Sequence, residues 1–366
     1  MRFSCIKSHL EHALSYAERF VGKNITLPIL GNVLLSADEG GLTVTATNLE
    51  HAIEIHVPGD TKRPGRVSVP ARIISSLIQG TREEKIELDA KQGNLLIASD
   101  SRQSRVNGMS ADDFPLIPKI KKVTGFSASA DTLSSALQHV LPAVSSSDFK
   151  PELGGVFFKA RENVLTLAAT DTFRLAEEEI AITKGPSAPS SSIVPQRTGQ
   201  EIARILGEYQ EEHVTAALGE NQLLVTVGPV RITTRLIEGA FPEYRAIIPS
   251  HFETSAFITR EELSQAVRSS GIFVSKLQEV TLNFAGGFVE VVSANPEVGE
   301  YRTKIKAHIT GKDNAISFNY RYLLDGITAL EEEELFFGLT DASAPALMRN
   351  KSAHSFTYVV MPIRLT

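Results

Sequence analysis

The segment "IVPQRTGQEIARIL" (residues 193–206) combines a short apolar strand, a proline and an amphipathic helix. Pro195 suits the end of a strand or the first turn of a helix, and the residues after it follow helical spacing. The same pattern recurs in "SVPARIISSLI" (residues 68–78) and "SFNYRYLLDGITAL" (residues 317–330). Each copy has an arginine at the same position near the start of its helix: Arg72, Arg197 and Arg321. The chain therefore contains a threefold internal repeat, and this repeat decides the fold.

Each copy also begins with another amphipathic helix. Its apolar residues recur at positions i, i+3 and i+4, which is the buried stripe of a surface helix. The corresponding trios are Leu10, Ala13 and Leu14, then Leu133, Ala136 and Leu137, and finally Leu263, Ala266 and Val267. The repeat thus includes two helices per copy.

Strands are expected between the two helices. "GNVLLSA" from Gly31 matches "GGVFFKA" from Gly154, and more loosely "QEVTLNF" from Gln278. A second strand follows in each copy, as "LTVTATN", "LTLAATD" and "VEVVSAN", and it ends at an Asn or Asp that suits a turn. These closing residues are Asn48, Asp171 and Asn295.

One copy therefore reads as strand, helix, several strands, helix, several strands. We expect an α+β protein of three repeated domains with mostly antiparallel sheets, at residues 1–122, 123–250 and 251–366. The Pro/Ser-rich stretch "TKGPSAPSSS" from Thr183 is too short for a flexible interdomain linker and is expected inside the second copy.

Composition restricts the function. The 366 residues are 42% hydrophobic and 22% charged, which is ordinary globular composition, and the net charge of −6 argues against a surface that binds nucleic acid all over. The one cysteine, Cys5, excludes an intramolecular disulfide and a multi-cysteine metal site, and it is expected to be a small buried hydrophobe. The N-terminus has no continuous apolar segment, so we expect a cytosolic protein.

Five segments in order resemble the bacterial β sliding clamp family, the β subunits of DNA polymerase III, over essentially the whole chain. They are "TLPILGNVLL", "LAATDTFRLA", "IVPQRTGQEIARIL", "GAFPEYRAIIP" and "YVVMPIRL". The resemblance implies a clamp fold, a head-to-tail homodimeric ring around duplex DNA, and helices that line the hole. It also implies a processivity factor without catalysis, cofactor or metal, which binds the polymerase catalytic subunit, the clamp loader and repair proteins through short hydrophobic peptides.

A ring that slides on DNA needs weak, sequence-independent phosphate contacts on its inner wall. The register of Arg72, Arg197 and Arg321 would repeat one such contact around the ring, and the negative charge would lie on the outer wall. The resemblance adds Lys23, Lys150 and Gln196 to the DNA-facing set. Alternatively, Lys23 and the other members of this set are ordinary solvated side chains on the surface.

The resemblance further implies a peptide groove and a dimer interface. The groove residues are Thr170, Thr172, Arg174, Leu175, Pro242, Ile247, Asn319, Tyr322, Ser343, Pro345, Val360, Met361, Pro362 and Ile363. The interface residues are Ser104, Val106, Ile272 and Phe273. The tail segment "YVVMPIRL" could also be simply the last core strand, and both interpretations can hold if alternate side chains face the core and the groove.

Three residues depart from the family pattern, Phe173, Ala246 and Thr366, and they put the peptide preference in doubt. Two other functions compete with the clamp. One is a metal-dependent nuclease using Asp171, Asp112 and Asp113, although Asp171 falls at the repeated Asx turn. The other is a monomeric interaction scaffold of three repeats.

Overall fold

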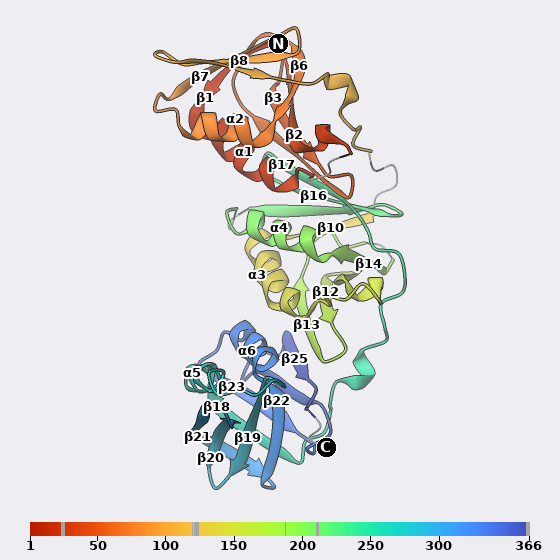
Figure 1. The fold of residues 1–366 in the computed structure, drawn as a ribbon. Coiled ribbons are helices and arrows are strands. Elements are labelled where there is room, and N and C mark those ends of the chain that lie inside the picture. The colour runs from red at the N-terminus through yellow and green to blue at the C-terminus, as the bar shows by residue number, and fades with distance from the viewer. Residues whose placement is uncertain (23–25, 119, 121–123, 187, 210–211, 364–366) are drawn as a thin grey trace. The chain divides into compact units, whose positions relative to one another are not determined.

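The computed structural model describes residues 1–22, 26–118, 120, 124–186, 188–209 and 212–363. The chain forms two compact units, whose helices and strands are labelled in Figure 1. Unit 1 comprises Met1–Asp131 and Arg204–Leu236, and unit 2 comprises Thr132–Ala203 and Ile237–Thr366. The middle repeat therefore contributes residues to both units.

The order of elements follows the predicted repeat. The first copy contains β1 (Arg2–Ile6), α1 (Lys7–Phe20), β2 (Asn32–Asp38), β3 (Gly41–Thr47), β4 (His51–Val57), β5 (Asp60–Arg63), β6 (Gly65–Pro70), α2 (Ala71–Gln79), β7 (Lys85–Lys91), β8 (Asn94–Ala98) and β9 (Gln103–Asn107). The second contains β10 (Thr124–Ser129), α3 (Ala130–Val140), β11 (Gly155–Arg161), β12 (Val164–Thr170), β13 (Arg174–Ala181), β14 (Ser190–Pro195), α4 (Gln196–Leu206), β15 (His213–Leu218), β16 (Gln222–Val227) and β17 (Val230–Arg235). The third contains β18 (Thr254–Thr259), α5 (Arg260–Ser270), β19 (Glu279–Ala285), β20 (Phe288–Asn295), β21 (Gly299–Gly311), β22 (Asn314–Asn319), α6 (Tyr320–Ala329), β23 (Glu334–Leu339), β24 (Ala346–Asn350) and β25 (Phe356–Val360).

The described strands pair antiparallel in three sheets. Unit 1 holds a five-stranded sheet, β5-β1-β7-β8-β9, and an eight-stranded sheet, β10-β15-β16-β17-β4-β3-β2-β6. Unit 2 holds a twelve-stranded sheet, β14-β11-β12-β13-β25-β24-β23-β18-β21-β20-β19-β22. The α+β prediction with antiparallel sheets is confirmed.

Neighbouring repeats share their sheets. In unit 1, β4 of the first repeat pairs with β17, the last strand of the second, and His51 lies opposite Thr234. In unit 2, β13 of the second repeat pairs with β25, the last strand of the third, and Arg174 lies opposite Val360. Hydrogen-bonded ladders therefore join neighbouring repeats within each unit.

The predicted helical stripes form the cores. The three residues of each trio are at most 4% exposed, as their spacing predicted. In unit 1, α1 and α2 pack against each other, and in unit 2, α5 packs on α6 and on the sheet strands β18, β20 and β21. None of the described helices is long and apolar enough to cross a membrane.

The copies differ most after their third meander strand. The first copy adds the short strand β5, and the third copy extends β21 to 13 residues. The second copy instead carries the Pro/Ser-rich stretch, which runs from the end of β13 to β14.

Candidate functional sites

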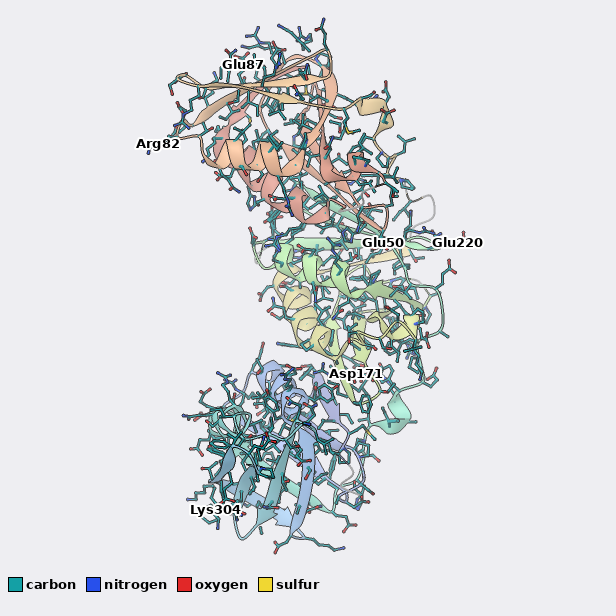
Figure 2. All side chains as sticks on the ribbon, viewed as in Figure 1. Glu50, Arg82, Glu87, Asp171, Glu220 and Lys304 are labelled. Carbon is teal, nitrogen blue, oxygen red and sulfur yellow. The ribbon has the colours of Figure 1, made fainter. Side chains whose placement is uncertain are left out.

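The first candidate site lies beside a repeated Asx turn. Between β12 and β13, Asp171 Oδ1 accepts hydrogen bonds from the backbone N–H groups of Phe173 (2.9 Å) and Arg174 (3.0 Å), and Figure 2 labels Asp171 at this turn. Thr170 Oγ1 donates to the Arg174 carbonyl at 2.6 Å and accepts from Thr172 N–H. Thr172 has a φ of 78°, which is uncommon for a side chain with a branched Cβ. The turn thus fixes Thr172 and Phe173 outside the sheet.

A groove of about 530 Å³ opens beside this turn in unit 2. It is lined by Thr172, Phe173, Leu277, Asn319, Tyr322, Met361, Pro362 and Ile363. Six of these residues belong to the groove that the family resemblance implied. The lining contains no charged side chain, so the groove suits an apolar ligand.

The tail after β25 forms one wall. Met361 N–H donates to the Phe173 carbonyl at 2.8 Å, and Ile363 N–H donates to the Ser317 carbonyl at 2.8 Å. The tail is therefore held to the Asx turn at one point and to β22 at another. Met361, Pro362 and Ile363 are each partly exposed, so they offer a formed apolar surface.

Sequence reasoning missed two lining residues. Phe173 was noted only as a departure from the family, and Leu277 was not singled out. The Phe173 ring stacks near Tyr322, with centroids 6.5 Å apart and an interplanar angle of 25°, while Leu277 is 60% exposed. A single exposed leucine in a turn has no periodic signal, so Leu277 could not be found from its spacing.

Arg174 contacts Tyr322, one of the residues that line the groove. Its Nε donates to Asp171 Oδ2 at 3.0 Å, its Nη1 bonds Asp325, and its guanidinium lies 4.3 Å from the centre of the Tyr322 ring. Burial opposes the charge, but Tyr358, Asp325 and Asp171 outweigh it and raise the pKa of Arg174 above its ordinary value. Arg174 therefore stays charged and positions Tyr322.

The remaining predicted groove residues lie in unit 2 but outside the lining. Leu175 and Val360 are buried in the sheet, where Leu175 packs with Ala168, Tyr244 and Val359. The segment with Pro242 and Ile247, both exposed, is held to β13 because the Tyr244 hydroxyl donates to Glu177.

The loop before β24 carries the last two predicted groove residues. Asp341 caps the turn that contains Ser343, since the N–H and hydroxyl of Ser343 both donate to Asp341 Oδ1 at 2.7 Å. Pro345 is half-buried and follows in the same loop. Of the three departures, Ala246 is exposed beside Ile247, and Thr366 lies outside the described residues.

The second candidate site is the set of repeated arginines. Arg72, Arg197 and Arg321 are each the second residue of their helices, α2, α4 and α6, and all are exposed. Arg72 Nε is 4.0 Å from Glu18 on α1, and Arg321 Nε donates to the Tyr320 hydroxyl at 3.2 Å. The predicted register is thus present.

Charge on the helices is only slightly positive. Lysines and arginines on α1 to α6 narrowly outnumber the acidic residues, whereas the whole chain carries −6. The helices are therefore less acidic than the chain as a whole.

Two other residues that were predicted to face DNA lie in the described part of the chain. Lys150 is exposed in the loop before β11, and Gln196 begins α4 and is half-buried. Phe149, next to Lys150, is 97% exposed and was not singled out from the sequence. Lys23 lies outside the described residues.

The third candidate site is a pair of sheet edges. In unit 1, β9 ends its sheet, with Ser104 half-buried and Val106 buried. In unit 2, β21 pairs with β20 from Gly299 to Lys306, but with β18 only from Ala307 onward. Within the described strands, one edge of β21 is therefore open over its first half. Phe273 stacks on Tyr301 of this half, with centroids 6.2 Å apart, and Ile272 is 69% exposed.

The acidic residues considered for a nuclease do not form a metal cluster. Asp171 is used by its own turn, and Asp112 pairs with Arg66 at 2.9 Å. Over the part of the chain that the structure describes, no group of three or more His, Cys, Asp or Glu side chains could hold a metal ion.

Family models match the chain in three consecutive parts. Residues 1–118, 128–243 and 245–364 match the N-terminal, central and C-terminal domains of the DNA polymerase III beta subunit. These matches agree with the threefold repeat found in the sequence.

Known proteins resemble the chain over its full length. It is 30% identical to a beta sliding clamp of Proteus mirabilis and 29% identical to one of Synechocystis, with all of each chain covered. A solved sliding clamp from Pseudomonas aeruginosa bound to griselimycin is 28% identical, with a TM-score of 0.95 over all of both chains.

Proposed function

Because the chain belongs to the DNA polymerase III beta subunit family of sliding clamps, a non-catalytic family, we propose how its candidate sites divide the work of a clamp. Two copies close head to tail into a ring around duplex DNA. The arginines of α2, α4 and α6 face the DNA, and the groove of unit 2 holds short apolar peptides of the polymerase catalytic subunit, clamp loader and repair proteins. The ring works at the replicating nucleoid in the bacterial cytoplasm.

The repeat junctions carry the ring proposal. In both junctions within the chain, the third meander strand of one repeat pairs with the last strand of the next: β4 with β17, and β13 with β25. The third repeat has its equivalent strand, β21, and the first repeat has its own last strand, β9. Each has an open edge, so pairing β21 with β9 of a second copy would repeat the same junction.

A heterologous interface of this kind closes into a ring when the rotation allows it. Open strand edges otherwise favour uncontrolled association, and closure removes them. Ile272 and Phe273 beside β21, and Ser104 and Val106 on β9, supply the interface side chains. The polar and basic character of β9 indicates that ion pairs contribute to the contact.

Retention on DNA tests the DNA-facing arginines. We expect an Arg72→Ala, Arg197→Ala variant to leave circular DNA faster than the wild type at moderate salt, because it has lost phosphate contacts. Each lost contact should also reduce the magnitude of the slope of log Kobs against log salt concentration by roughly 0.9. Nicked circles and linear DNA are compared. The wild type should stay on circles and run off linear ends, and equal retention of variant and wild type would contradict the DNA-facing assignment.

The peptide groove is supported by its apolar lining and by the griselimycin complex of the P. aeruginosa relative. Met361 gives the groove an adaptable wall, which suits several different peptides. We expect Met361→Arg to weaken binding of the polymerase catalytic subunit by about tenfold or more, measured by surface plasmon resonance. Met109→Arg, also at an exposed methionine but outside the groove, is the matched control. Unchanged affinity of the Met361 variant would remove the groove from the proposal.

A further inference from the structure

The Asx turn that borders the peptide groove has a counterpart in unit 1. Between β3 and β4, Asn48 Oδ1 accepts from the N–H groups of Glu50 (3.0 Å) and His51 (2.9 Å), as Asp171 does in unit 2. Thr47 Oγ1 donates to the His51 carbonyl at 2.9 Å and accepts from Leu49 N–H at 3.0 Å. Leu49 has a φ of 78°, the same value as Thr172. The two turns share every one of these contacts.

The strand beyond the turn is also held in the same way. Arg235 N–H donates to the Glu50 carbonyl at 2.9 Å, as Met361 N–H donates to the Phe173 carbonyl at 2.8 Å. Arg235 ends β17 and Met361 follows β25, and these two strands occupy equivalent places in their junctions. The backbone frame of the unit 2 groove is therefore repeated in unit 1.

A second groove, of about 330 Å³, lies on this frame. Its apolar lining comes from Leu49 of the turn and from the segment after Phe114, namely Pro115, Leu116, Ile117 and Pro118. Leu49 is 51% exposed and Leu116 is 92% exposed. Exposed apolar side chains that line a groove are typical of a binding surface.

Charge distinguishes the two grooves. The unit 1 groove is lined by Glu50 and Arg235, whereas the unit 2 lining has no charged side chain. Glu50 is exposed, and the exposed Glu220 immediately precedes the lining residue Asn221 in the chain; Figure 2 labels both glutamates. The exposed carboxylate of Glu50 in the lining favours a ligand that carries a basic group next to its apolar part.

We propose that the unit 1 groove binds an extended peptide of a partner protein, with one apolar side chain against Leu49 and Leu116 and an adjacent lysine or arginine opposite Glu50. This inference rests on the peptide-binding function proposed for the unit 2 groove, because the shared backbone frame is the reason to expect the same kind of ligand. The clamp would then hold two classes of peptide, one apolar and one basic, at separate places.

A synthetic hexapeptide library with leucine or phenylalanine fixed at the third position, and the other positions varied, tests the proposal. It is panned on the full-length Met361→Arg variant, which blocks the unit 2 groove, and on the same variant carrying Leu49→Asn and Leu116→Ser. Asn tolerates a positive φ, and both replaced side chains are exposed, so thermal unfolding should not change. Glu50→Lys in the Met361→Arg background is the third protein.

We expect peptides with lysine or arginine beside the fixed residue to be enriched on the first protein and not on the second. The affinity of an enriched peptide, by fluorescence polarisation, should fall by about tenfold or more with Leu49→Asn and Leu116→Ser. Glu50→Lys should shift enrichment toward aspartate and glutamate. Absence of enrichment, or the same peptides on all three proteins, overturns the proposal.

The unit 2 groove is judged separately in the same library. A Leu49→Asn, Leu116→Ser protein with Met361 intact should enrich apolar peptides. If it does not, the function proposed for the unit 2 groove fails, whatever the Met361→Arg panel shows for unit 1.

Discussion

At the scale of single residues, three Asx side chains fix the turns that follow the second meander strand of each repeat. Asn48 and Asp171 directly follow a strand, Asn295 ends one, and each accepts a backbone hydrogen bond in the turn. All three were predictable because a short polar side chain has few other roles at that place. Because the Asp171 carboxylate accepts hydrogen bonds within its turn, the turn also argued against Asp171 as a metal ligand. The exposures of Phe173 and Leu277 were not predictable, because they depend on which segments meet around the groove.

Cys5 gives a test at the same scale. Burial raises the pKa of the Cys5 thiol to about 12 from its ordinary value of 9.0. The thiolate is the reactive form, so we expect alkylation by iodoacetamide at neutral pH to be about a thousandfold slower in the folded protein than in the unfolded one. Mass spectrometry with and without denaturant measures this. Rapid labelling of the folded chain would contradict the buried placement of β1.

At the scale of elements, one histidine connects a helix to a strand in unit 2. His139 of α3 lies 2.8 Å from Glu178 of β13 through Nδ1 and 3.5 Å from Glu331 through Nε2, and its ring contacts Phe356 of β25. Burial by itself lowers the pKa of His139, but the hydrogen bond and charge of Glu178, with the charge of Glu331, raise it above 6.5. Protonated His139 therefore fastens α3 to the ladder that joins two repeats.

This arrangement predicts a pH dependence. A raised pKa in the folded state means that the stabilisation is complete below the unfolded value of about 6.5 and is lost as the pH rises through the folded value. We expect the melting temperature of the wild type to fall over that window relative to His139→Gln. Thermal unfolding followed by circular dichroism at several pH values measures the difference. If the melting temperatures of the two proteins change with pH in parallel, His139 does not contribute to the pH dependence of stability.

The helices illustrate the limit of prediction at this scale. Their buried trios followed from spacing, because a helix turns by a fixed angle per residue. The register of Arg72, Arg197 and Arg321 followed from the threefold repeat of the segments that contain them. The pairing of β4 with β17 and of β13 with β25 could not be derived, since no local pattern specifies which strand of another repeat lies beside a given edge.

At the scale of the whole molecule, the open edges of β9 and β21 predict a dimer. Ile272 is exposed in the single chain, so Ile272→Glu should leave the fold intact while placing a charge in the proposed interface. We expect this variant to dissociate to monomers at concentrations about tenfold or more above those at which the wild type does. Sedimentation velocity measures this.

Val164→Glu, at an exposed valine of β12, is the control for the dimer test. If both variants sediment as the wild type does, β21 does not form the contact. If both variants dissociate to monomers, the added charge weakens the dimer wherever it is placed, and the test does not support a contact at β21.

The pairing of β13 with β25 also governs how the nascent chain matures. β25 follows β13 only after the whole of the third repeat's other strands and helices, yet it lies between β13 and β24 in the sheet of unit 2. During synthesis, β13 leaves the ribosome long before its partner exists. The sheet of unit 2 can close only after β25 has been synthesised, so the middle repeat must pass through a period in which its strand edge is open to chaperones or to neighbouring chains.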